Sequence, residues 1–143
     1  MGAAANAPAM PVHNKLDGSG KKILVIDDDL AIRVLLQAVL KRMQFEVDLA
    51  EDGAVGLEKL QQDGTVDLIL LDLMMPRLNG YEFIDEVRKR YDARPHIVVF
   101  TAAGRRGVDK IPSHAVCASI LKPFDLDKFI EIISDCIAQS HAT

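Results

Sequence analysis

The sequence has no tryptophan, only two cysteines and few aromatic residues, which make up 5% of its 143 residues. It also lacks an excess of basic residues, because 17 Lys and Arg stand against 21 Asp and Glu. Domains that bind a nucleic-acid backbone usually carry a clear surplus of Lys and Arg, so we expect no direct nucleic-acid partner. No apolar run approaches the roughly 18 residues of a membrane-spanning helix, so we expect no membrane insertion either.

The cysteines and histidines give no sign of a metal or redox centre. Cys117 and Cys136 form no C-x-x-C pair and have mainly apolar neighbours, so we predict two packed free thiols rather than a disulfide or a metal pair. The four histidines are isolated, and no zinc site is predicted. The N-terminal residues Met1 to Asn14 lack the basic and apolar regions of a signal peptide, so we predict a cytoplasmic protein.

The length predicts one domain without a separate output or catalytic module. Residues 1–20 are rich in Ala, Pro, Gly and Asn and have neither helical nor strand periodicity, which predicts a disordered N-terminal tail. The folded domain is expected to occupy residues 21–140.

Strand-like and helical patterns alternate along this domain. Continuous apolar runs at 23–26, 68–71 and 97–100 are typical of strands buried on both faces of a parallel sheet. The alternating segment 46–50 predicts an edge strand, and 120–121 a short fifth strand. Helical stretches are expected at 30–43, 54–62, 81–91 and 126–138. The alternation predicts an α/β fold of the (βα)5 type, a doubly wound parallel five-stranded sheet with helices on both faces, in three layers.

Two local features refine this expectation. Gly104, Gly107 and Pro112 interrupt any long helix between 102 and 119, so a short or irregular element is expected there. Asp29 and Asp125 each precede a helical stretch and are expected to act as N-caps.

Polar and charged residues follow the predicted strands at their carboxyl ends, which meet at one rim of a parallel sheet and form its usual ligand site. The residues are Asp27-Asp28-Asp29 after the first strand, Asp72 after the third, Thr101 after the fourth and Lys122-Pro123 after the fifth. We therefore expect these groups to converge on one small pocket.

The carboxylates Asp27, Asp28 and Asp72 require a counter-ion, because two unit charges ~4 Å apart near a protein surface repel by ~4 kcal/mol. Oxygen ligands supplied by few protein groups suit Mg²⁺ better than a caged Ca²⁺. The Lys122 ammonium and the Thr101 hydroxyl would complete a site for a phosphoryl group on a nucleophilic aspartate.

This set of residues resembles the receiver domain of two-component response regulators, the chemotaxis-regulator-like family. The resemblance covers about Lys21 to Ala138 and rests on four motifs in family order, ILVIDDD, LILLDLMMPRLNG, VVFTAAG and ILKPF. It implies a flavodoxin-like fold with strand order 2-1-3-4-5. It also implies a phosphoacceptor signalling switch that is not an enzyme, apart from its own phosphorylation and dephosphorylation.

The resemblance further implies a role for each motif residue. Asp72 would be the phosphoacceptor and form a 4-aspartylphosphate, while Thr101 and Lys122 would bind its phosphoryl group. The Mg²⁺ ligands would be Asp28, Asp72, the backbone carbonyl of Met74, and Asp27 acting mainly through metal-bound water. Pro123 would follow Lys122 through a cis peptide bond.

The phosphodonor implied by the resemblance is a histidine on the helical bundle of a sensor histidine kinase or phosphotransfer protein. The predicted helix 30–43 needs Leu35, Leu36, Val39, Leu40 and Met43 to cover the sheet. Its further apolar residues therefore suggest a docking face, which we assign to Ile32 and Val34. Ordinary apolar scatter on the surface is the alternative.

The sequence departs from the family pattern at Ser119, where an aromatic switch residue usually stands three positions before the lysine. Met74 and Ala103 occupy positions that tune phosphate loss in the family. Ser119 and the interrupted fourth crossover leave open a phosphorylation-independent, receiver-like scaffold as an alternative function.

Two other site classes are disfavoured. A haloacid-dehalogenase-like phosphatase needs an aspartate where Met74 stands. The segment Gly18 to Lys21 precedes the first strand, and Lys22 replaces the Ser or Thr of a nucleotide-binding phosphate loop.

Overall fold

The computed structural model describes residues 17–91 and 95–141. They form one parallel sheet of five strands in the order β2-β1-β3-β4-β5. The strands are β1 (Lys22–Ile26), β2 (Glu46–Ala50), β3 (Leu68–Leu71), β4 (His96–Thr101) and β5 (Ala118–Leu121). This confirms the predicted fold, including the edge position of β2. The strand β5 is longer than the predicted 120–121, because its first residues pair with Val98 and Val99 of β4.

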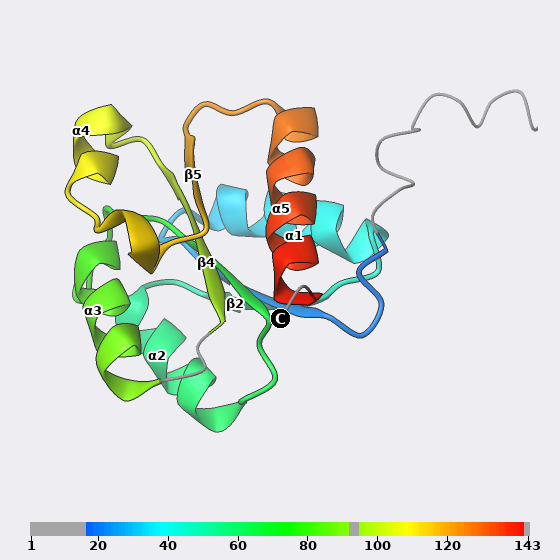
Figure 1. Ribbon diagram of the computed structural model, residues 1–143, viewed down its shortest axis with the longest axis horizontal. Helices are drawn as coiled ribbons and strands as arrows, with labels where there is room; N and C mark the ends of the chain where they lie inside the picture. Colours follow the sequence, from blue (N-terminus) through cyan, green and yellow to red (C-terminus); the bar gives the residue numbers. More distant parts are fainter. Residues whose placement is uncertain (1–16, 92–94, 142–143) are drawn as a thin grey trace, which may run out of the picture.

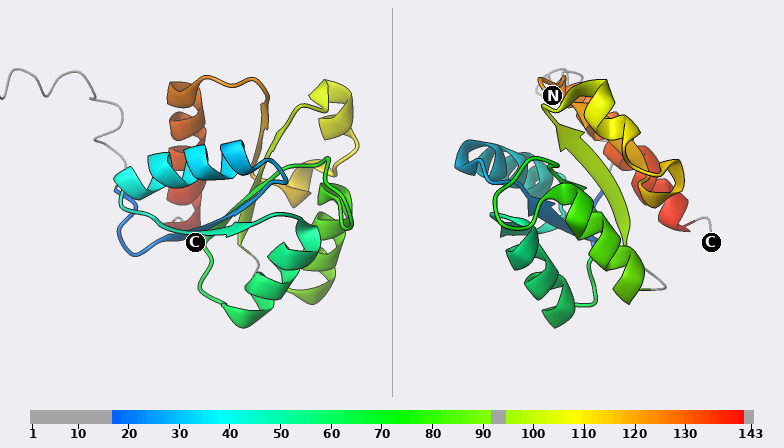
Figure 2. Two further views of the ribbon diagram at one scale, coloured as in Figure 1. Left: turned by 180° about the vertical axis from the view of Figure 1, so that it is seen from behind. Right: turned by 90° about the vertical axis from the view of Figure 1, so that its left-hand side faces the viewer.

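Helices follow the strands, as the alternation predicted. They are α1 (Leu30–Arg42), α2 (Gly53–Gln62), α3 (Gly80–Arg90), α4 (Gly104–Asp109) and α5 (Leu126–His141), with a 3-10 helix, η3 (Ser113–Ala115), before β5. α1 and α5 cover one face of the sheet, and α2 and α3 cover the other (Figures 1 and 2). No helix among residues 17–91 and 95–141 is long and apolar enough to cross a membrane.

The two faces of the sheet bury separate apolar clusters, because side chains alternate along each strand. On one face Ile23 and Val25 of β1 pack with residues of α1 and α5, including Leu36 and Phe129. On the other face Leu24 and Ile26 pack with α2 and α3. Since β1, β3 and β4 are buried on both faces, their sequences are continuous apolar runs rather than alternating ones.

Side chains cap the helices whose first residues lie at the carboxyl rim. Asp29 accepts a hydrogen bond from the Ala31 amide at the start of α1, as predicted, and Asp52 does the same for α2 through the Val55 amide. Asn79 and Glu82 form a reciprocal capping box on α3. Asp125 accepts a hydrogen bond from the Asp127 amide in the first turn of α5, which confirms the predicted cap. These caps satisfy amides that would otherwise lack partners.

The fourth crossover is short and irregular, as the glycines and Pro112 predicted. α4 has 6 residues, no side chain caps it, and Gly104 at its start has φ +75°. A left-handed backbone at that position favours glycine. A helix this short makes few internal hydrogen bonds, so contacts with the rest of the protein must fix its position.

The N-terminal boundary differs from the prediction at four residues. The predicted tail falls mostly on residues 1–16, which lie outside the described part of the chain. Asp17 to Gly20, by contrast, form a turn in which the Gly18 amide donates to the Met43 carbonyl over 2.7 Å. A Cβ on Gly18 would lie 2.5 Å from the Phe45 ring. Assigning these four residues to the tail was therefore wrong, since tertiary contact orders a segment without periodicity.

The prediction of two free thiols was also wrong. Cys117, just before β5, and Cys136, in α5, form a disulfide with a Cα–Cα distance of 6.2 Å. Cys136 is 2% exposed and belongs to the α1–α5 cluster, so its apolar surroundings were predicted correctly. The same packing that buries it brings it to its partner, which neighbouring sequence alone does not reveal.

Candidate functional site

The residues after each strand are held in place because backbone pairing continues past the strand ends. The Asp27 amide donates to Ala50, the Asp72 amide to Ile26 and the Lys122 amide to Thr101, over 3.1, 3.0 and 2.8 Å. The backbone pairing therefore fixes the position of each rim residue relative to its neighbours. The structure brings Asp27, Asp72 and Lys122 into contact, as predicted from the strand ends.

Three carboxylates form the centre of the site. Asp27, Asp28 and Asp72 each offer an oxygen, and these oxygens lie within 4.8 Å of one another. Asp27 is fully buried and Asp72 is 5% exposed, whereas Asp28 is exposed to solvent. The cluster thus has a buried side and an open side, and its all-oxygen donors suit a hard divalent cation.

One lysine partly balances the carboxylates. Nζ of Lys122 lies 2.8 Å from Oδ2 of Asp27 and 3.7 Å from Oδ2 of Asp72. It also lies 4.9 Å from the centroid of the Phe100 ring, within cation–π range. Three carboxylates against one ammonium leave the ionised site with a surplus of negative charge that a divalent cation would neutralise.

The pKa of Asp27 reflects its burial and its charged neighbours. Burial raises the pKa of the Asp27 carboxyl, and the nearby charge of Asp72 raises it further. The hydrogen bonds from Lys122 and from the Asp29 amide act in the opposite direction but do not cancel the rise. The surroundings of Asp27 therefore oppose its ionisation.

Thr101 and Met74 flank the carboxylates. Thr101 is fully buried, and its Oγ1 accepts a hydrogen bond from the Ala103 amide over 3.1 Å. The Met74 amide donates to Oδ1 of Asp72 over a long 3.4 Å, while the Met74 side chain is 62% exposed. The first residue of α3, Gly80, packs against the backbone of the site. A Cβ on Gly80 would lie 2.6 Å from the Asp72 carbonyl oxygen. The peptide bond between Lys122 and Pro123 is cis, as the resemblance implied.

Two arginines near the rim were not predicted from the sequence. Nη1 of Arg33 in α1 donates to the Asp27 carbonyl over 2.6 Å, and Nε of Arg77 donates to the buried carboxylate of Asp52 over 2.7 Å. Arg33 lies six positions after Asp27, on the first turn of a predicted helix, which could have suggested its contact. Arg77 lies 25 positions after Asp52, and no local pattern links the two.

An apolar groove of about 470 Å³ adjoins the site between α1 and the loop after β5. Its lining comprises Ile32, Leu35, Ala102, Lys122, Pro123, Phe124 and Leu126. Of the two residues predicted for docking, Val34 is 53% exposed, whereas Ile32 is only partly exposed and packs on the core. Leu35, assigned to the sheet side, is instead 46% exposed, because it lies on the solvent side of Leu36.

The sequence also matches a known family. Residues 23–134 match the sequence model of the response regulator receiver domain, so the chain belongs to that family. Among its relatives are the Regulator of RpoS of Escherichia coli K12, with 32% identity over 122 residues, and the response regulator ArlR of Staphylococcus saprophyticus, with 34% over 111 residues. These matches cover 85% and 76% of this chain but 36% and 49% of the relatives, so the chain spans a third to a half of their length.

A solved structure supports the same assignment. The response regulator protein TrrA of Thermotoga maritima, crystallised in complex with Mg²⁺ and BeF, is 33% identical and superposes with a TM-score of 0.73. The match covers 81% of this chain and 98% of TrrA. Receiver domains are signalling switches of two-component systems rather than classical enzymes, and histidine kinases or phosphotransfer proteins phosphorylate them.

Proposed function

We propose that this domain accepts a phosphoryl group on Asp72 from a phosphohistidine. An Oδ atom of Asp72 attacks phosphorus, an O–P bond forms, and the P–N bond breaks with its electron pair passing to the imidazole, which takes up a proton. The observation that carries the proposal is the convergence of Asp27, Asp28 and Asp72 with Lys122 at one rim. The same site would catalyse only its own labelling and hydrolysis.

The residues around Asp72 would handle the added charge. Lys122 is 3.7 Å from Oδ2 of Asp72 and would turn toward the phosphoryl oxygens, leaving Asp27. The Thr101 hydroxyl still has its proton to donate while its oxygen accepts from Ala103. Both groups would act as preorganised donors on the buried side of the site.

We further propose that Mg²⁺ is held by Asp27, Asp28, Asp72 and the Met74 carbonyl. The all-oxygen donor set, its negative surplus and the exposed Asp28 side suit this ion. A divalent cation bound there would neutralise charge on the carboxylates and on the phosphoryl oxygens. The protein would contribute the fixed spacing of the strand ends.

The donor would dock on α1 as a helical bundle that carries the phosphohistidine. Leu30, Val34 and Leu35 are 63%, 53% and 46% exposed, and α1 thus carries three of the six large apolar side chains that are exposed in the described part of the chain. Leu35 and Lys122 both line the apolar groove, and Lys122 lies next to Asp72. A helix packed in this groove would therefore bring its histidine to the rim that holds Asp72. Helix-in-groove contacts of this kind use such apolar anchors.

We also propose that residues 21–140 form the receiver domain, preceded by the Asp17–Gly20 turn. We propose that the protein is cytoplasmic and makes no direct contact with nucleic acid.

A scaffold whose partner binding does not depend on phosphorylation is the second candidate function. It is favoured by Ser119 on β5 and by the 6-residue α4, which depart from the family's usual switch region.

The test compares wild type with Asp72→Asn after addition of Mg²⁺ and a small phosphodonor. Intact mass measures phosphoryl incorporation, and amide exchange measures any change in conformation. We expect incorporation and altered exchange in wild type only. Equal incorporation in both proteins, or none in either, would reject the phosphoacceptor proposal, while incorporation without altered exchange would favour the scaffold.

A further inference from the structure

The short helix α4 is held at two places, and one of them is an aromatic side chain from a different helix. The Tyr81 hydroxyl, in the first turn of α3, donates to the Gly107 carbonyl of α4 over 2.7 Å. Tyr81 is partly buried against the apolar cluster beneath α2 and α3, and this packing holds its ring in place. α3 follows the loop that begins at Asp72, and this hydrogen bond therefore joins the loops on both sides of the site.

The second attachment comes from the site itself. The Ala103 amide donates to Oγ1 of Thr101, and Ala103 directly precedes α4. A Cβ built on Gly107 would lie 2.6 Å from Cβ of Ala103 and 3.2 Å from the Tyr81 hydroxyl oxygen. Thr101, Ala103, Gly107 and Tyr81 thus form one contiguous chain of close contacts, in which the absence of a side chain at Gly107 is required.

We propose that Tyr81 is a positioning residue that couples a phosphoryl group on Asp72 to the position of α4. The inference rests on the proposed function, because it begins with that phosphoryl group. Its charged oxygens accept the proton of the Thr101 hydroxyl and compete with Oγ1 of Thr101 for the Ala103 amide, since charged acceptors form stronger hydrogen bonds than a neutral hydroxyl. Ala103 then shifts against Gly107, and the hydrogen bond from Tyr81 is strained or broken.

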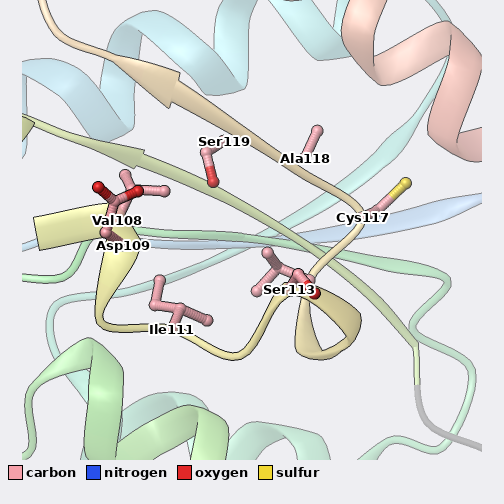
Figure 3. Close-up of a pocket in the computed structure, with 8 residues that line it drawn as sticks. Val108, Asp109, Ile111, Ser113, Cys117, Ala118 and Ser119 are labelled. Atoms are coloured by element: carbon pink, nitrogen blue, oxygen red, sulfur yellow. The ribbon is translucent and has the colours of Figure 1, made fainter. Parts of the chain in front are cut away.

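A shift of α4 would change the shape of a groove on the protein surface. Val108 and Asp109, which follow Gly107, line a groove of about 490 Å³ on the β5 side of α4. Figure 3 shows Asp109 and Ser119 at one end of this groove, with Ile111 and Ser113 farther along it. The small Ser119 leaves α4 without an aromatic contact from β5, so the contact from α3 takes over its positioning.

The composition allows a specific test. The chain has two tyrosines and no tryptophan, so Tyr91→Phe leaves Tyr81 as the sole tyrosine fluorophore. Beryllium fluoride with Mg²⁺ serves as the phosphoryl mimic, and its binding is followed independently by fluorine NMR. We expect Tyr81 emission to change with the same half-saturation as binding, and the change to be lost when Asp72→Asn is added.

Amide exchange then tests positioning. In Tyr81→Phe we expect α4 amides to exchange about fivefold faster without the mimic, the factor for one lost neutral hydrogen bond, and to respond little when it is added. Bound beryllium fluoride with unchanged Tyr81 emission would overturn the proposal, as would α4 exchange in Tyr81→Phe equal to wild type. Failure of Asp72 to take up a phosphoryl group from a small phosphodonor would instead overturn the proposed function together with it.

Discussion

Nζ of Lys122 lies closer to Asp27 than to Asp72, at 2.8 Å against 3.7 Å from the respective Oδ2 atoms. The ammonium therefore serves first as the counter-ion of the fully buried Asp27, whose pKa is raised mainly by burial. Lys122 would have to exchange this partner for a phosphoryl oxygen when Asp72 is modified. A cation bound near Asp27 would make that exchange easier, which would link the lysine to the proposed metal.

Removing Lys122 should leave Asp27 buried without its ion pair. We predict that Lys122→Gln lowers the free energy of unfolding by about 3 kcal/mol in the absence of Mg²⁺, since breaking a buried pair leaves an uncompensated charge. Urea unfolding measures the loss. The double variant Asp27→Asn/Lys122→Gln should recover most of it, and a double variant as unstable as the single one would show that the charge is not the cause.

The disulfide between Cys117 and Cys136 predicts how reduction changes the mass and the stability of the protein. Intact mass of the non-reduced protein should be lower by two hydrogen atoms than that of the reduced protein, and reduction should lower stability by about 3 kcal/mol for a loop of this length. Cys117→Ser/Cys136→Ser should match the reduced protein and be insensitive to dithiol. Unequal masses without a change in stability would contradict a structural role. Such bonds are rare in cytosolic proteins and are often redox-sensing where they occur.

The ion pair between Asp52 and Arg77 predicts that the stability of the fold depends on pH. Burial raises the pKa of Asp52, but the Val55 amide and the Arg77 guanidinium outweigh it, so the pKa lies below the ordinary 3.8. A lowered pKa stabilises the fold above the unfolded-state pKa, and the contribution is lost as pH falls through the folded-state value.

Arg77→Gln should therefore cost about 1–2 kcal/mol at neutral pH, and its deficit relative to wild type should shrink below about pH 4. Glutamine keeps a side chain at this residue, whose φ is 65°, so backbone strain is unchanged. Lys89→Gln, which removes an exposed contact of 3.9 Å with Glu86, is the matched control and should cost almost nothing at any pH. A deficit that stays constant in acid would contradict the assignment.

Docking on α1 predicts a difference between phosphodonors. Leu35→Glu should slow transfer from a phosphohistidine bundle at least about tenfold, the effect of roughly 1.4 kcal/mol in docking, while labelling by a small phosphodonor stays unchanged. Gln61→Glu, on the other face of the sheet, controls for the added charge. Equal slowing with both donors would mean that the substitution damages the site rather than docking.

The sheet and the site could be predicted because their signals are local. Apolar runs such as 68–71 mark doubly buried strands, and the polar residue after each strand falls on the rim by topology alone. The disulfide was missed because proximity of Cys117 and Cys136 depends on how α5 packs. One signal was available, since Cys136 lies seven positions after Phe129 on the buried face of α5.

Other errors share the same cause. Leu35 fits either side of α1 by periodicity, and only the packing of Leu36 and Leu40 decides the orientation. The Asp17–Gly20 turn has no pattern of its own and is ordered by Met43 and Phe45. Contacts between distant segments, such as that of Tyr81 with Gly107, leave no trace in local sequence.

Locating the modified residue tests the central claim most directly. Protein treated with Mg²⁺ and a small phosphodonor is reduced with borohydride, which converts an aspartyl phosphate to homoserine, and is then mapped by peptide mass spectrometry. The account predicts homoserine at residue 72 and at neither Asp27 nor Asp28. Homoserine at another aspartate, or none in any peptide, would contradict it.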